Sequence, residues 1–406
     1  MEKHSRSSFN IHKEGLMPKE EILEVVKQQK SLKIGVPKEN HAIESRVPLT
    51  PEAIEILIEN GHEVILERGA GKASNYPDTD YSERGGLITD DRKEVFNCDL
   101  LLKITPPTLQ EIEWLKERQT LISSFQAQIH EDEGYVRGLM NKHVTAVAFE
   151  EIQDEHKCYP VVRSMSSIAG TTAVLIAAEY MSNVRGGKGV MLGGISGISP
   201  TEVVILGAGT VAEYAVRAAM GLGSNVKVFD HSIHRLRRLQ SSVGQMIPTS
   251  IFHPKVIQKA LRSAEVLIGA MRENERHYGF YITEEMVKEM KSGSIIIDVS
   301  IDHGGCVETS ELRTQEDPVF TKYGVVHYCV PNIPSRVART ASIAISNVFS
   351  PLIVSTGLTG GIANQLKEDI GFRHGVYIYN GILTNDIIGK RFGIPSKDID
   401  LLMAAF

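Results

Sequence analysis

Three small residues at fixed spacing, Gly207, Gly209 and Ala212, are typical of a turn that holds a pyrophosphate. They follow the apolar run 203–206 and open a helical pattern, and a second apolar run then ends in Asp230. In a dinucleotide-binding βαβ unit of this order, the glycines permit the turn and the approach of the pyrophosphate, and the third residue lets the helix pack closely. The pyrophosphate would lie on free N–H groups at the helix start. Asp230 would accept a hydrogen bond from the ribose 2′-OH and repel a 2′-phosphate, which favours NAD over NADP.

Four further polar residues follow strand-like runs, which is where ligands bind in open α/β sheets. Arg46 stands in a loop after the first run, and its guanidinium could grip a carboxylate through two hydrogen bonds. Lys103 directly follows an apolar run, so its ammonium is either a surface charge or a cation at a pocket. Asp302 and Asn332 also follow such runs, and both residue types are common in turns. Each residue alone therefore leaves open a second interpretation, as a solvated or turn-forming residue.

Short strand-like runs alternate with helical segments from residue 32 to about residue 160. The runs read LKIGV, HEVILE, DLLLKI, QTLISS and VTAVAF, an alternation typical of a doubly wound α/β unit. The long apolar segment SMSSIAGTTAVLIAAEYMS predicts a helix that bridges two domains, and the following RGGKGVMLGGISGISP predicts a ribbon or linker. A second unit runs from the glycine fingerprint through EVLIGA, SIIIDVS and GVVHYCV. After Pro334 we expect helices and a tail without strands of its own, packed on the first unit.

This organisation predicts an α/β fold of two Rossmann-like doubly wound domains, with the NAD-binding domain inserted in the substrate domain. Residues 1–31 are expected to form an N-terminal extension, and residues 161–338 the NAD-binding domain. Residues 32–160 and 339–406 together are expected to form the substrate, or catalytic, domain.

The composition, 42% apolar and 23% charged, is that of a globular protein. The net charge of −6 comes without a basic cluster, so no nucleic-acid partner is indicated. No apolar run reaches the ~18 residues of a membrane span, and the start lacks the apolar segment of a signal peptide. No CxxC or metal-ligand spacing joins the four cysteines, Cys98, Cys158, Cys306 and Cys329. This predicts no metal site and favours a reduced, cytoplasmic setting.

Several segments together resemble the alanine dehydrogenase family, which shares its fold with the NAD-binding subunit of proton-translocating nicotinamide nucleotide transhydrogenase. The resemblance runs from about Lys33 to the C-terminus. It is carried by IGVPKENHAIESRVPLTP, GHEVILERGAGKASNYPDTDY, MSSIAG and GKGVMLGGISGISPTEVVILGAGTVAE, and by the more specific SGSIIIDVSIDHGGCVETS and GVVHYCVPNIPSRVARTAS. The resemblance implies a reversible, NAD-linked oxidative deamination of L-alanine to pyruvate and ammonia. It also implies a homo-oligomer, because relatives assemble as hexamers.

The resemblance further implies roles for individual residues. Arg46 and Lys103 match the family's ligands of the substrate carboxylate and oxo group, and Asp302 matches its catalytic aspartate. Asn332 matches an asparagine near the nicotinamide and the substrate. We expect Asp302 to act as the base and Lys103 to polarise the oxo group. Cofactor contacts are expected at Ser166, Gly207, Ala208, Gly209, Thr210, Val211, Asp230, Met271, Asp302 and Asn332.

Two segments depart from the family's pattern. Alanine dehydrogenases carry a histidine in a segment of the type TYLHLA, where this chain reads LISSFQAQ, and His130 just beyond is out of register. Gln126 in that segment can orient a substrate but cannot carry a proton. This segment is closer to the transhydrogenase subunits. MSSIAGTTA also departs, since it lacks the Glu and Arg that usually follow MS and AG.

Three alternatives to an alanine dehydrogenase therefore stand. The chain could be a transhydrogenase NAD-binding subunit, which would exchange hydride only with an NADP-loaded partner, or a saccharopine-type imino-acid reductase. It could also be a catalytically silent NAD-binding regulatory protein, which would explain the missing histidine. The joint presence of Arg46, Lys103, Asp302 and Asn332 argues against this last alternative.

Overall fold

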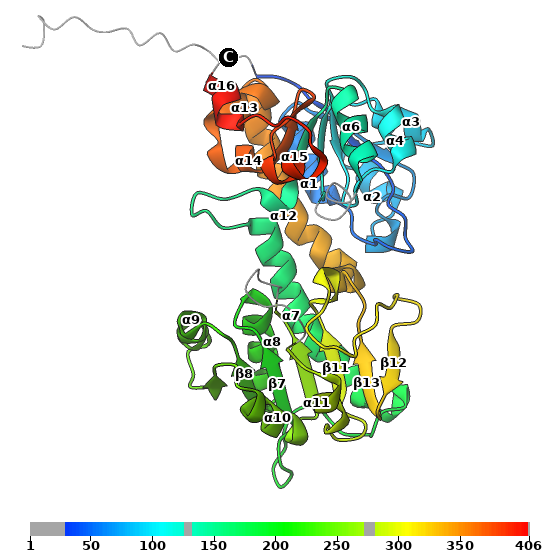
Figure 1. Ribbon diagram of the computed structural model, residues 1–406. Helices are drawn as coiled ribbons and strands as arrows, with labels where there is room; N and C mark the ends of the chain where they lie inside the picture. Colours follow the sequence, from blue (N-terminus) through cyan, green and yellow to red (C-terminus); the bar gives the residue numbers. More distant parts are fainter. Residues whose placement is uncertain (1–28, 126–131, 272–280, 405–406) are drawn as a thin grey trace, which may run out of the picture.

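The computed structural model describes residues 29–125, 132–271 and 281–404, which form two α/β lobes joined by two long helices (Figure 1). The first lobe is built on an eight-stranded sheet and the second on a seven-stranded sheet. The chain leaves the first sheet after residue 148 and returns to it at residue 376. The predicted α/β fold, with one doubly wound unit inserted in the other, is therefore confirmed.

The eight-stranded sheet has the order β15-β14-β6-β5-β4-β1-β2-β3. Strands β1 to β6 run parallel, while β14 is antiparallel to β6 and β15 to β14. The strand order reverses between β1 and β4, and ligands bind outside the carboxyl ends of strands at such a switch point. The bounds are β1 Lys33–Val36, β2 Glu63–Glu67, β3 Leu87–Thr89, β4 Leu100–Leu102, β5 Thr120–Ser123, β6 Thr145–Ala148, β14 Val376–Tyr379 and β15 Ile382–Leu383.

The seven-stranded sheet has the order β12-β13-β11-β10-β7-β8-β9, with only the edge strand β12 antiparallel to its neighbour. Its switch point lies between β7 and β10. The glycine fingerprint directly follows β7, so the fold places it at the opening of this crevice. The bounds are β7 Glu202–Leu206, β8 Asn225–Phe229, β9 Thr249–Ser250, β10 Val266–Gly269, β11 Ile295–Asp298, β12 Val319–Lys322 and β13 Val325–Tyr328.

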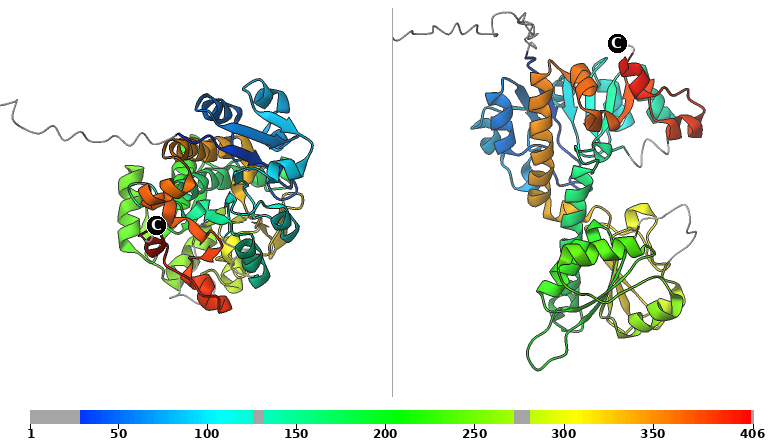
Figure 2. Two further views of the ribbon diagram at one scale, coloured as in Figure 1. Left: turned by 90° about the horizontal axis from the view of Figure 1, so that it is seen from above. Right: turned by 90° about the vertical axis from the view of Figure 1, so that its left-hand side faces the viewer.

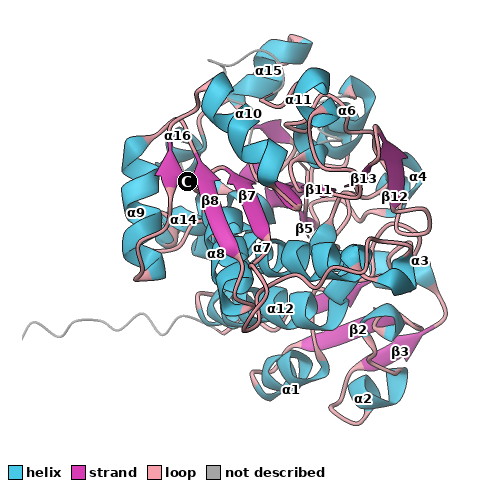
Figure 3. Ribbon diagram, turned by 90° about the horizontal axis from the view of Figure 1, so that it is seen from below, coloured by secondary structure: helices cyan, strands magenta, loops and turns pink. Residues whose placement is uncertain are grey.

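Helices cover both faces of each sheet, and a buried apolar layer lies under each cover. In the second lobe they surround the strands when seen from below (Figure 3). Local signals set helix starts: Thr50 caps α1, with Pro51 in its first turn, and Thr108 and Glu111 form a capping box at α4. The first lobe has α1 Pro51–Glu59, α2 Asp78–Ser82, α3 Arg92–Phe96, α4 Leu109–Trp114, α6 Glu133–Asn141, α13 Ile362–Glu368, α14 Ile370–His374, α15 Asp386–Phe392 and α16 Ile399–Ala404. The second lobe has α8 Thr210–Gly221, α9 Ile233–Val243, α10 Pro254–Ser263 and α11 Glu284–Lys288.

The two long helices, α7 (Pro160–Met181) and α12 (Ala338–Leu358), carry the chain between the lobes. In the right-hand view of Figure 2, α7 (green) spans the gap and α12 (orange) runs along the first lobe. By length and composition alone, α7 and the segment Ile333–Leu358 could each cross a membrane. Both contribute buried residues to the cores of the lobes, so their apolar length serves internal packing.

The C-terminal tail corrects one prediction. We expected no strands there, but β14 and β15 form a hairpin that extends the first sheet beyond β6. Asn380 and Gly381 form its turn with φ of 47° and 79°, the left-handed pair that a two-residue hairpin favours. The run VYIYNGIL thus carried a hairpin signal that the helical reading of the tail missed.

Candidate active site

A cleft of about 630 Å³ lies between the two lobes and brings together most of the predicted site residues. One wall comes from the first lobe and the start of α7, and the other from the carboxyl ends of the second sheet. The predicted residues that line it are Arg46, Ser166, Gly207, Ala208, Gly209, Thr210, Val211, Asp230, Met271 and Asp302. Lys103 and Asn332 do not line it, and Gln126 lies outside the described residues.

The turn between β7 and α8 has the open shape that a pyrophosphate needs. Gly207 adopts a φ of +102°, and a Cβ there would lie 2.4 Å from the Ala270 carbonyl oxygen, so only glycine fits. Gly209 precedes α8 with no side-chain cap, and a Cβ there would meet nothing within 4 Å. Ala212 is fully buried where the helix packs on the sheet. The free N–H groups of a 12-residue helix therefore face open space, as the fingerprint predicts.

Asp230 lies at the end of β8 and is fully buried, yet it lines the cleft. Its Oδ2 accepts from the Ala208 N–H at 2.7 Å, and its Oδ1 accepts from the Ser232 N–H at 2.7 Å. The carboxylate thus holds the glycine turn as well as facing the cleft. Two cations that the sequence analysis did not single out, Arg235 and Arg238 on α9, line the same cleft.

Arg46 is not a solvated loop charge, because its side chain is only 11% exposed and is paired with Glu44. The Nε donates to Glu44 Oε1 at 2.8 Å and the Nη2 to Oε2 at 2.6 Å, while Nη1 lies 3.2 Å from the Met165 sulfur. Asn332 comes from the other lobe and donates from Nδ2 to the same Glu44 Oε2 at 2.8 Å. Burial raises the pKa of the Glu44 carboxyl, but the charge and hydrogen bonds of Arg46 outweigh it and hold that pKa below its usual value.

Asp302 stands in the short 3₁₀ segment Ile301–His303, after β11. It remains accessible from the cleft, yet desolvation by the surrounding walls raises the pKa of its carboxyl. The Asn332 N–H, 3.4 Å from Oδ2, and the positive charge of Arg46 oppose this rise. A raised pKa suits a group that must take and release a proton near neutral pH.

Lys103 is buried rather than open to the cleft. Its Nζ donates to Glu39 Oε2 at 2.8 Å and to the Thr105 hydroxyl. Glu39 Oε1 also accepts from the Ile104 N–H at 2.6 Å. Glu39 and Glu44 stand in the same loop after β1, and each pairs with one of the two cations that the sequence analysis assigned to substrate binding.

Phe125 stands in the segment LISSFQAQ, where the resemblance leads us to look for a histidine, and its ring is fully buried. Its N–H donates to Glu150 Oε1 at 2.7 Å, and Ser124 and Glu150 both line the cleft. Glu150 was not among the predicted site residues, although an acid directly after the strand-like run VTAVAF was a usable signal.

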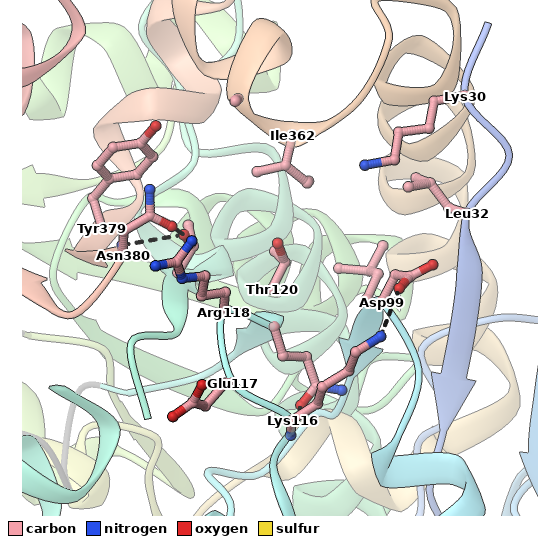
Figure 4. Close-up of a pocket in the computed structure, with 14 residues that line it drawn as sticks. Lys30, Leu32, Asp99, Lys116, Glu117, Arg118, Thr120, Ile362, Tyr379 and Asn380 are labelled. Carbon is pink, nitrogen blue, oxygen red and sulfur yellow. Dashed lines mark hydrogen bonds and ion pairs between the residues drawn. The ribbon is translucent and has the colours of Figure 1, made fainter. Parts of the chain in front are cut away.

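A second pocket, of about 250 Å³, lies at the amino ends of β4, β5 and β6, opposite the cleft-facing ends (Figure 4). Lys30, Lys116 and Arg118 line it together with the acids Asp99 and Glu117. Lys116 Nζ donates to Asp99 Oδ1 at 3.3 Å. None of the predicted site residues lines this pocket.

Comparisons with known proteins identify the family of the chain. The family models "Alanine dehydrogenase/PNT, N-terminal domain" and "C-terminal domain" match residues 35–169 and 173–386. The chain is 37% identical to an alanine dehydrogenase of Bacillus subtilis, over 89% of this chain and 94% of that protein. It is 34% identical to one of Staphylococcus saprophyticus, over 90% and 98%.

Two solved structures share the fold of this chain. An L-alanine dehydrogenase superimposes with a TM-score of 0.82 at 32% identity, over 89% of this chain and 99% of that chain. A transhydrogenase from Sinorhizobium meliloti shares the fold, with a TM-score of 0.74 at 20% identity, over 87% and 99%. The chain belongs to the alanine dehydrogenase/PNT family.

Proposed function

We propose that the protein catalyses the reversible, NAD-dependent oxidative deamination of L-alanine to pyruvate and ammonia. The observation that carries this proposal is the cleft between the lobes, which the glycine turn, Asp230 and Asp302 of the second lobe line together with Arg46 of the first. Relatives that are 34–37% identical along nearly the whole chain are named alanine dehydrogenases, which supports the same substrate.

NAD fits the residues of the second lobe. The N–H groups at the start of α8 and the open space at Gly209 suit a pyrophosphate, and Asp230 suits a ribose hydroxyl. Ser166 and Met271 line the cleft and would contact the cofactor further along. When bound, the nicotinamide accepts or returns the hydride of the substrate carbon.

Arg46 would bind the substrate carboxylate, and Asp302 would carry protons to and from the substrate. Glu44 occupies the Nε side of the Arg46 guanidinium. The N–H groups of Nη1 and Nη2 that point away from Nε therefore remain for the carboxylate of a substrate. Asp302 would take a proton from the water that attacks the imine carbon, which gives a carbinolamine. Asp302 would then return that proton to nitrogen and take the proton of the carbinolamine hydroxyl, so that ammonia leaves and the carbonyl of pyruvate forms. Lys103 would polarise the oxo group, and its bond to Glu39 would have to loosen for it to reach the cleft.

We further propose the domain division predicted above, with residues 161–338 as the NAD-binding domain. The proposal includes a hexamer, which the family resemblance supports. It also includes a cytoplasmic location, which is supported by the four cysteines that form no disulfide in the described residues. The transhydrogenase-subunit alternative draws on the LISSFQAQ segment, and the likeness to the transhydrogenase structure supports the shared fold alone.

The test is NADH oxidation by the purified chain with pyruvate plus ammonium. Parallel reactions contain glyoxylate with ammonium, 2-oxoglutarate with lysine, an NADP-loaded transhydrogenase partner, or no acceptor. We expect ammonium-dependent oxidation with pyruvate. Oxidation only with 2-oxoglutarate and lysine would favour the saccharopine-type alternative. Hydride exchange only with an NADP-loaded partner would favour the transhydrogenase subunit, and NADH binding without turnover would favour a regulatory protein.

A further inference from the structure

Glu44 is a buried anion between the lobes, with a side chain only 1% exposed. Its Oε1 accepts from the Arg46 backbone N–H at 2.9 Å and from the Ser335 hydroxyl at 3.1 Å, besides the Arg46 Nε. Its Oε2 accepts from Arg46 Nη2 and Asn332 Nδ2. Both carboxylate oxygens are therefore fully used by donors from two parts of the chain.

These contacts fix which side of Arg46 faces the cleft. A guanidinium has five N–H donors, and Glu44 uses the one on Nε and one of the two on Nη2. Nη1 lies 3.2 Å from the Met165 sulfur, which is only a weak acceptor, so the donors left for a substrate are on Nη1 and Nη2, and Arg46 lines the cleft. Without Glu44 the planar group could turn about its side-chain torsions, and the carboxylate of a substrate would meet no fixed pair of donors.

The same carboxylate ties the two lobes at the edge of the cleft. Asn332 and Ser335 come directly after the last parallel strand of the second sheet, 288 and 291 residues from Glu44 in sequence. Ser335 also accepts from the Ser45 N–H at 2.8 Å. Glu44, together with the bond between Ser45 and Ser335, thus sets the distance between Arg46, which would hold the oxo acid, and the Asn332 loop beside Asp302.

We propose that Glu44 is a positioning residue, which orients Arg46 and Asn332 together so that a 2-oxo acid carboxylate is held in register with the cofactor site. This inference rests on the proposed function. The plain alternative is that Glu44 only stabilises the fold. Loss of one partner of a buried ion pair is strongly destabilising because the other charge is left unpaired, so the melting temperature should fall for either role, and the two roles differ in kcat/KM and in NADH binding.

The test compares the parent protein with Glu44→Gln and Ser335→Ala. Glu44→Gln keeps the size but replaces one acceptor oxygen with a donor, which opposes the donors of Arg46 or Asn332. Ser335→Ala removes one donor to Glu44 and also the acceptor of the Ser45 N–H, and it spares the contacts between Glu44 and Arg46. The matched control is Glu202→Gln, because Glu202 is a partly buried carboxylate paired with Lys227 at the far end of the second sheet. The measurements are kcat/KM for pyruvate with ammonium, the Kd of NADH, the melting temperature, and hydrogen–deuterium exchange of segments 45–47 and 332–335.

Since misplacement by about 1 Å costs ~100-fold in rate, we expect a loss of that order in kcat/KM for Glu44→Gln and a smaller loss of the same parameter for Ser335→Ala. The Kd of NADH and the control should change little, and exchange should rise in both segments together. A kcat/KM within about threefold of the parent overturns the inference. A parallel loss of NADH binding and melting temperature assigns Glu44 to the fold instead, and overturns it too.

The exchange readout separates this inference from the proposed function. A parent protein that does not reduce pyruvate overturns the function, and Glu44 is then judged by exchange alone. If Glu44→Gln leaves either segment unchanged, the inference falls whatever the substrate. If Glu44→Gln does not fold, the same comparison is made with Ser335→Ala, whose unchanged exchange and kinetics would overturn it.

Discussion

Asp302 combines access to the cleft with a carboxyl whose pKa is raised by desolvation. As a base in deamination it must be ionised, so the rate should fall as pH drops through its pKa. This acid limb should lie above the range of an ordinary aspartate, whose pKa is about 3.9.

Asp302→Asn should remove deamination and leave NADH binding nearly intact, because the amide keeps the shape but cannot take a proton. Steady-state kinetics across pH check both points, and deamination within a few-fold of the parent would assign the base elsewhere.

Substrate binding by Arg46 is expected to depend on the planar shape of its guanidinium as well as on its charge. Arg46→Lys keeps the charge, but an ammonium cannot satisfy both Glu44 oxygens and present two fixed donors to a substrate. We expect pyruvate binding to the NADH-loaded protein to weaken by about 1.5–3 kcal/mol, the range of a hydrogen bond to a charged group, with NADH binding unchanged. Calorimetry measures both. Arg68→Lys, at an exposed pair with Asp90, is the control, and equal pyruvate affinity in parent and Arg46→Lys would disprove the role.

Cofactor choice should rest on three charges at one end of the cleft. Asp230 opposes a 2′-phosphate, whereas Arg235 and Arg238 line the same cleft and would attract it. We expect the parent to bind NADH more tightly than NADPH. Asp230→Asn should reduce the difference in affinity between NADH and NADPH. NADH binding should weaken because the hydrogen bonds to the glycine turn weaken, and NADPH binding should strengthen because the two guanidiniums are then unopposed. Fluorescence titrations give the four dissociation constants, and Arg238→Gln should lower NADPH affinity alone. Equal affinities in the parent would disprove the assignment.

At the scale of the elements, the glycine turn gives a prediction with its own control. Gly207→Ala places a Cβ 2.4 Å from a carbonyl oxygen at a φ of +102°, a backbone strain that costs ~1–3 kcal/mol even before the contact is relieved. It should lower the melting temperature and abolish NADH binding. Gly209→Ala has open space and a φ of −87°, so it should fold normally and weaken NADH by filling the cradle. Equal melting temperatures for the two variants would contradict this reading of the turn.

The sequence predicted the elements best where the pattern is local. The apolar runs before Gly207 and Lys103 are strands, and the strand-order reversal places both residues at the ends that face a crevice. The long-range contacts of the two acids could not be found this way. Glu39 pairs with Lys103, 64 positions away, and Glu44, which stands two residues from Arg46, also binds Asn332, 288 positions away, so only the folded chain shows these contacts. The C-terminal hairpin was predictable from Asn380-Gly381, but the helical pattern on both sides obscured it.

At the scale of the whole molecule, the cleft exists because α7 and α12 hold two lobes with open sheet ends toward one another (Figure 1). Neither lobe carries a complete site: the second holds the glycine turn and Asp302, and the first holds Arg46 and Glu150. The chain leaves the first lobe, forms the second lobe and returns to the first, so residues that are far apart in the sequence meet in the cleft. Function is therefore expected to require the full chain, with α7 and α12 intact.

The most direct test of the proposed activity is to follow the transferred hydrogen. The purified protein is supplied with NADH deuterated on each face of C4 in turn, with pyruvate and ¹⁵N-ammonium, and the product is read by mass spectrometry. We predict L-alanine that contains ¹⁵N, with deuterium at Cα from one face of the nicotinamide only. Alanine without deuterium from either face, or no alanine beside demonstrable NADH binding, would contradict direct hydride transfer to an imine of pyruvate in this cleft.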